Sequence, residues 1–131
     1  MKKIFIGPSS FCQNSDEPIN ILNKHNFEVV LNPLGRKLNE EELIKLLDKN
    51  FIGSIAGLEK YNEKTLLNSD LKVISRVGSG LDNINFDYTS RKNIKIFSTP
   101  DGPVNSVAEL TISMIINLVR NIFPNVNSMS Q

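Results

Sequence analysis

Residues 73–80 read VISRVGSG, and this stretch decides the fold that we expect. A strand-like run at 73–77 ends at two glycines that flank Ser79. Further apolar runs alternate with segments of helical period along the chain, at residues 3–7, 27–31, 51–56 and 94–97. This alternation is typical of α/β domains with a parallel sheet, so we predict one sheet of five strands.

Four short helices are expected between these strands, at residues 17–24, 40–48, 62–67 and 86–91. Asn39 precedes the second helix, where its side chain can accept hydrogen bonds from the free amides of the first turn. A longer helix follows a turn at 99–103, and Ser106 and Glu109 have the spacing of a capping box at its start. The last residues, 124–131, are polar, and we expect a frayed tail there.

The longer helix is apolar over most of its circumference, and Glu109, Ser113 and Asn117 mark its one polar face. A helix of that kind needs cover on more than one side. One small sheet supplies only one side, so the pattern indicates that a neighbour is missing. We therefore expect self-association through the apolar surface.

Composition and charge disfavour several classes of function. The chain of 131 residues has 15 basic and 14 acidic residues, and no basic run favours nucleic acid or a membrane surface. Gly7 and Pro8 end the first apolar run too early for a signal peptide, and the stretch 107–123 is too short and too polar to span a bilayer. Cys12 is the only cysteine, so we expect a free thiol and a cytoplasmic protein of one domain.

The glycine pair is the clearest candidate site. It follows a strand at the edge where open parallel sheets bind ligands, and the amides of Gly78, Ser79 and Gly80 can cradle a carboxylate or a phosphate. A tight turn without a ligand explains the same pattern. The motif is not a dinucleotide fingerprint, because Asn83 stands in place of the third glycine. Asp82 and Asn83 can either reach a ligand or fix a turn.

No catalytic set is visible in the sequence. His25 is the only histidine and has no acidic or nucleophilic partner nearby in the chain. The loop at 101–106 leads into a helix N-terminus that can help to hold an anion, although capping by Ser106 explains it equally. We find no metal-ligand spacing and no phosphate-binding Walker loop. The residues alone thus predict an α/β domain with an anion-accepting loop and no defined reaction.

Three blocks of the chain resemble the D-isomer-specific 2-hydroxyacid dehydrogenases, above all their phosphoglycerate dehydrogenase-like members: residues 74–84, 94–103 and 106–111. The blocks follow that family's order and spacing. The resemblance implies a flavodoxin-like, doubly wound parallel sheet as the substrate domain, with a Rossmann domain for NAD elsewhere in the chain. It also implies hydride transfer between the nicotinamide and C2 of a small 2-hydroxy or 2-oxo acid, and a homodimer in the full-length family.

The resemblance assigns ligand-binding roles to residues at matching positions. Gly78, Ser79 and Gly80 would offer backbone amides to the substrate carboxylate. Ser79 would also lie near the nicotinamide end of NAD. Leu58 and Glu59 would belong to the loop that faces the far end of the substrate.

Three further residues would support the site through structure. The resemblance implies that Asn83 braces the glycine loop, and that Ser106 and Glu109 start the helix leading to the hinge. One departure from the family concerns specificity. Gly57 and Leu58 stand where many phosphoglycerate dehydrogenases have an Arg-Ser pair, which argues against phosphoglycerate itself as the substrate.

The resemblance places the dinucleotide fingerprint, the carboxylate-binding arginine and the catalytic histidine and glutamate later than residue 131. We therefore expect a substrate domain over 1–123, a tail over 124–131 leading to the NAD domain, and no catalytic residue or activity in this polypeptide alone. An alternative is a stand-alone module that binds small carboxylates without catalysis. A receiver-like signalling domain is disfavoured, because Gly7-Pro8-Ser9-Ser10 stands where acidic residues are needed.

Overall fold

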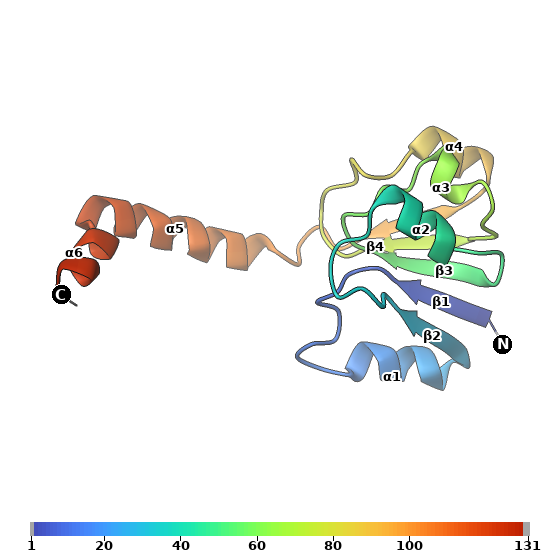
Figure 1. The fold of residues 1–131 in the computed structure, drawn as a ribbon, viewed down its shortest axis with the longest axis horizontal. Helices are drawn as coiled ribbons and strands as arrows, with labels where there is room; N and C mark the ends of the chain where they lie inside the picture. The colour runs from blue at the N-terminus through green and yellow to red at the C-terminus, as the bar shows by residue number, and fades with distance from the viewer. Residues whose placement is uncertain (1, 130–131) are drawn as a thin grey trace. The chain divides into compact units, whose positions relative to one another are not determined.

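The computed structural model describes residues 2–129. The N-terminal part of the chain contains a parallel sheet (Figure 1). Its five strands pair in the order β2-β1-β3-β4-β5, all parallel. This order is flavodoxin-like, with the switch point between β1 and β3, so the predicted fold class is confirmed. The elements are β1 Lys2–Ile6, α1 Glu17–Lys24, β2 Phe27–Leu31, α2 Glu40–Leu46, β3 Phe51–Ala56, α3 Glu63–Leu66, β4 Val73–Arg76, α4 Phe86–Arg91, β5 Lys95–Ser98, α5 Val104–Arg120 and α6 Ile122–Met129.

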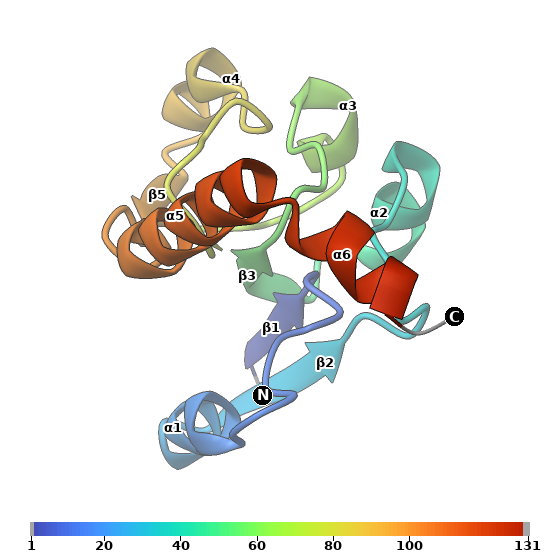
Figure 2. The ribbon, with the colours of Figure 1, turned by 90° about the vertical axis from the view of Figure 1, so that its left-hand side faces the viewer.

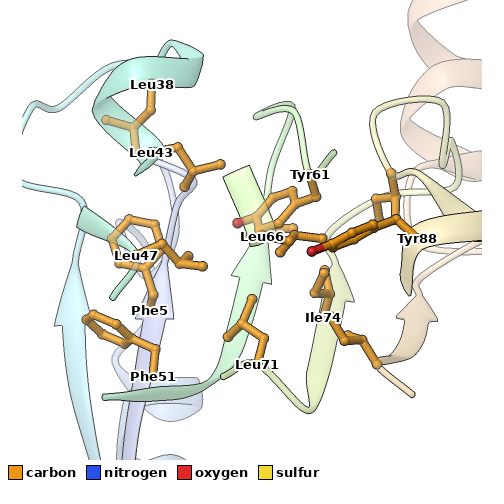
Figure 3. Close-up of a cluster of buried hydrophobic side chains, with 13 residues drawn as sticks. Phe5, Leu38, Leu43, Leu47, Phe51, Tyr61, Leu66, Leu71, Ile74 and Tyr88 are labelled. Atoms are coloured by element: carbon orange, nitrogen blue, oxygen red, sulfur yellow. The ribbon is translucent and has the colours of Figure 1, made fainter. Parts of the chain in front are cut away.

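The two faces of the sheet are covered by different helices. Figures 1 and 2 show α2, α3 and α4 on one face, whereas α1 lies on the opposite face beside β2. Buried side chains fill the space between the sheet and the three helices (Figure 3). Phe5 and Phe51 meet edge to face with ring centroids 5.7 Å apart. This packing fixes the strand ends from which the site is built.

One buried polar pair lies within this core. The hydroxyls of Ser54 and Tyr61 are 2.7 Å apart, so each satisfies the other away from water. Burial raises the pKa of Tyr61, because the phenolate form is disfavoured in the core. The pair joins the end of β3 to the loop that follows it.

Asparagines cap three of the short helices. The capping role predicted for Asn39 is confirmed: its Oδ1 accepts from the Glu42 amide at 2.9 Å, and Glu42 Oε2 accepts from the Asn39 amide at 2.9 Å. Asn62 caps α3 with the same reciprocal pair of bonds, to Thr65, whereas at α4 only the Asn85 side chain accepts, from the Tyr88 amide. Each cap satisfies amides that the first turn leaves free, which explains where these short helices begin.

Helices α5 and α6 form a second compact unit, Pro100–Gln131, separate from the unit Met1–Thr99 that contains the sheet. Neither helix contains a buried residue. The predicted substrate domain of 1–123 extends past this division and stays a prediction. Among residues 2–129 no single helix is long and apolar enough to cross a membrane, but α5 and α6 together, bent by 61°, reach that length and composition.

Two predictions for this second unit are wrong. Ser106 is not a cap: α5 begins at Val104 after Pro103, with no side-chain hydrogen bond at the cap, so Ser106 and Glu109 lie inside the helix. The preceding turn and the fixed φ of proline start the helix earlier than the capping pattern suggested. The expected frayed tail is helical from Ile122 to Met129, and residues 130–131 lie outside the described residues.

Candidate functional site

A pocket opens at the carboxyl ends of three neighbouring strands, β1, β3 and β4. Its volume is about 350 Å³, and it is lined by Pro8, Ser9, Ser10, Lys37, Gly57, Leu58, Glu59, Arg76 and Val77. The loops after β1 and β3 leave the sheet at its switch point, where open α/β sheets bind their ligands. The position of the pocket therefore follows from the strand order.

The glycine loop lies next to this pocket. The Gly78 amide donates to Thr99 Oγ1 at 2.8 Å, and the Thr99 amide donates to the Gly78 carbonyl at 3.1 Å. The prediction that the Gly78 amide is open to a ligand is therefore wrong in this structure. Ser79 and Gly80 are exposed, and no residue among 2–129 accepts a hydrogen bond from either amide. These two amides remain available to an anion.

Arg76 is the residue that the sequence analysis missed. It ends β4, it is 8% exposed, and its guanidinium lies so close to Gly78 that a Cβ there would be 2.6 Å from Nη1. Its Nε is buried and has no hydrogen-bond partner among residues 2–129. The sequence did contain a signal for this residue: Arg76 stands in the predicted strand at 73–77, and charged residues buried in a sheet are rare unless they are paired.

Glu59 differs from its predicted place opposite the substrate. It is 2% exposed, and its Oε2 accepts from the Gly57 amide at 2.7 Å. A Cβ on Gly7 would lie 2.8 Å from the same oxygen, and one on Gly57 would lie 3.1 Å from it. The carboxylate thus forms the floor of the pocket and joins the loops after β1 and β3. Both glycines are needed there because their backbones approach Glu59 closely.

Asn83 braces a different loop from the one predicted. Its Nδ2 donates to the Glu59 carbonyl at 2.6 Å and to the Gly57 carbonyl at 3.1 Å, so it holds the loop after β3. Leu58, at the tip of that loop, is 58% exposed and lines the pocket, and its place opposite the far end of the substrate stays a prediction. Lys37 is exposed and contributes a second cation to the pocket lining.

The catalytic domain of the D-isomer specific 2-hydroxyacid dehydrogenases matches residues 10–130 of the chain. The chain belongs to this family. Proteins assigned as 2-hydroxyacid dehydrogenases in Staphylococcus saprophyticus and Staphylococcus epidermidis are 30% and 32% identical to it over 106 residues, 79% of this chain. The chain spans about a third of their length, 33% in each case.

Solved members of the 2-hydroxyacid dehydrogenase family share the fold. The 3-phosphoglycerate dehydrogenase of Entamoeba histolytica, solved with NAD+ bound, is 32% identical, with a TM-score of 0.78 over 88% of this chain and 38% of that one. The D-lactate dehydrogenase of Aquifex aeolicus is 24% identical with a TM-score of 0.68, covers 98% of this chain and 38% of its own, and supports the fold alone. The resemblance that the sequence indicated is confirmed, and the family consists of oxidoreductases of 2-hydroxy acids.

Proposed function

We propose that this chain is the substrate-side domain of an NAD-dependent D-2-hydroxyacid dehydrogenase, which interconverts a 2-hydroxy acid and a 2-oxo acid by hydride transfer. The observation that carries the proposal is the pair of free amides at Ser79 and Gly80, beside the buried Arg76 guanidinium. Backbone amides and a guanidinium are the donors that a carboxylate needs. The chain's part in the reaction is to bind and orient the acid.

NAD, when bound, would be the hydride acceptor. The glycine loop of this chain does not have the features of a dinucleotide-binding site. The glycine loop is followed by a turn at 82–83, and the next helix begins only at Phe86. A dinucleotide cradle needs a helix directly after the glycines. Ser79 is exposed at the tip of the loop, and we propose that it meets the nicotinamide end of NAD and that the 131 residues alone have no dehydrogenase activity.

The binding role can be tested on the chain itself. We expect titration of the 15N-labelled chain with pyruvate to give saturable shifts of the Ser79 and Gly80 amides, because these donors have no internal partner. Gly35 is an internal control, since it is an exposed glycine in the loop before α2. Acetone, which lacks the carboxylate, is the control ligand and should shift neither amide. Shifts of equal size at Gly35 would contradict the assignment.

The catalytic part of the proposal needs the remaining two thirds of a relative. A chimera would join this chain to the other part of the Staphylococcus saprophyticus protein. We expect the chimera to oxidise NADH with 2-oxo acids, and the chain alone to show no turnover. Activity of the chain alone, or a folded chimera that binds NADH and reduces no 2-oxo acid, would refute this part of the proposal.

A further inference from the structure

Three strands of the sheet have helices on one face only. Helices α2, α3 and α4 cover that face, whereas α1 lies on the opposite face beside β2 (Figures 1 and 2). The strand order places β2 at one edge of the sheet and β3, β4 and β5 towards the other edge. Within residues 2–99, the opposite face of β3, β4 and β5 therefore has no helix over it.

The side chains on this uncovered face are largely apolar. Ile96 packs against the core, so the next residue, Phe97, points to the opposite face, where it is 57% exposed. The register places Ser75 beside Phe97 and Ile55 beside Ser75, in one row across three strands, and the half-buried Val73 lies on the same face. We call Ile55, Val73, Ser75 and Phe97 the open sheet face. An apolar sheet face is stable when another element covers it.

Helix α5 also lacks cover. None of its 17 residues is buried, and Ile115 and Leu118 are 55% and 78% exposed. The helix is rich in Val, Ile and Thr, which have a lower intrinsic helix propensity than Ala or Leu. A helix of this composition depends on the packing of its apolar side. A sheet face is one of the two surfaces against which such a helix packs in domains.

The charges favour a contact between a helical unit and a sheet unit. Residues 100–131 hold one basic residue, Arg120, and two acidic ones, Asp101 and Glu109, whereas residues 1–99 hold 14 basic and 12 acidic residues. Two units of the same kind therefore repel, and units of different kinds attract. Lys95 is exposed two residues before Phe97 and adds a positive charge next to the open sheet face.

The size of α5 indicates how many such contacts a stable assembly needs. At 1.5 Å per residue the helix is about 25 Å long and about 10 Å wide, so one helix on one sheet covers roughly 500 Å² counted over both surfaces. This is too small for a specific interface, whereas two such contacts reach the lower limit of about 1,000 Å². A reciprocal exchange between two copies supplies both contacts.

We propose that two copies of the chain form a twofold dimer in which α5 of each copy packs on the open sheet face of the other. The occupant of the face is thus a second copy of this chain, and the polar side of α5, with Glu109, Ser113 and Asn117, stays in water. The inference goes beyond the proposed function, because neither the open sheet face nor α5 lines the pocket at the strand ends.

The first test substitutes one exposed phenylalanine on each face of the sheet. Sedimentation velocity over a dilution series of the full chain measures the dissociation constant of the dimer. We expect Phe97→Glu to raise that constant by about tenfold or more, because it places a charge in the apolar contact. Phe86→Glu, on α4, replaces a phenylalanine that is 48% exposed on the covered side and should leave the constant unchanged.

Phe97→Ser is the milder variant, to be used if circular dichroism shows that Phe97→Glu does not fold. It removes the apolar ring without adding a charge, and it should weaken the dimer in the same direction.

The second test locates the contact between copies without altering it. In a Cys12→Ser background, Ser113→Cys carries a nitroxide spin label on the polar side of α5 in unlabelled copies, which are mixed with 15N-labelled copies that carry no spin label. We expect the label to broaden the amides of Ser75 and Phe97 in the 15N-labelled copies. The amides of α3, on the covered face, are the internal control and should keep their intensity.

Each alternative occupant gives a different result. Association of Phe97→Glu with an unchanged constant, or broadening confined to α5 and α6, would assign association to helix on helix and overturn the proposal. A chain that stays monomeric would leave the open sheet face to a different protein and would also overturn it. The pyruvate titration of Ser79 and Gly80 does not depend on any of these results, so the proposed function can fail or stand separately.

Discussion

Gly78 is constrained twice, by its backbone and by its neighbour. Its φ is +132°, a conformation that L side chains rarely adopt, and a Cβ would lie 2.6 Å from Arg76 Nη1. We expect Gly78→Ala to lower the free energy of unfolding by about 1–3 kcal/mol, because the backbone is strained and the guanidinium must move. Urea unfolding followed by circular dichroism measures this loss.

Gly80 provides the matched control for that substitution. Its φ is not in the left-handed region, and the nearest atom to an added Cβ is Asp82 Oδ2 at 3.7 Å, an ordinary contact. Gly80→Ala should therefore change the unfolding midpoint little. Equal destabilisation in both variants would show that Arg76 and the backbone of Gly78 do not form the constraint. The glycine pattern in the sequence could not separate these two positions, because the difference depends on where Arg76 points.

At the scale of elements, the start of α2 carries a charge-dependent cap. The hydrogen bond from Arg36, followed by that from the Asn39 amide, lowers the pKa of Glu42 to about 2 from its ordinary value of 4.5. Because the pKa is lowered on folding, this stabilisation is fully present above pH 4.5 and is lost as the pH falls towards about 2. We expect Glu42→Gln to lower the Tm at neutral pH, and the difference from the unsubstituted chain to shrink over that window.

Glu41→Gln is the control for this pH dependence, since Glu41 is exposed in the same first turn. Its Tm should follow that of the unsubstituted chain across the acid range. A constant difference between Glu42→Gln and the unsubstituted chain, from pH 7 down to pH 2, would contradict the assigned pairing. Thermal unfolding at several pH values supplies all of these measurements.

The elements also show what the sequence can predict. The strands and the helices α1–α4 follow hydrophobic runs and caps that depend on neighbouring residues, so local patterns located them to within two residues. The prediction that Ser106 caps α5 was wrong because the residue spacing of a capping box also occurs inside helices. The helix begins earlier, after Pro103. The inward turn of Glu59 and the burial of Arg76 could not be predicted from the sequence for a different reason. Both depend on contacts with parts of the chain that local patterns do not describe.

At the scale of the whole molecule, the core does not involve the last two helices. Every residue of the main hydrophobic cluster precedes Thr99, whereas α5 and α6 have no buried residue. Many of their apolar side chains are exposed, Leu118 to 78% and Val119 to 74%. Exposed apolar surface of this extent tends to bind other surfaces, so we expect the self-association of the chain to depend on residues 100–131.

Removing residues 100–131 tests this division of the molecule. We expect a chain of residues 1–99 to keep the unfolding midpoint of the sheet and to be monomeric in sedimentation velocity, while the full chain associates with increasing concentration. In the full chain, Leu118→Glu should weaken association, because it places a charge on the apolar surface. Ser113→Glu adds the same charge on the polar face and should leave association unchanged. A monomeric full chain at high concentration, or unfolding of residues 1–99, would show that the two units do not divide stability and association in this way.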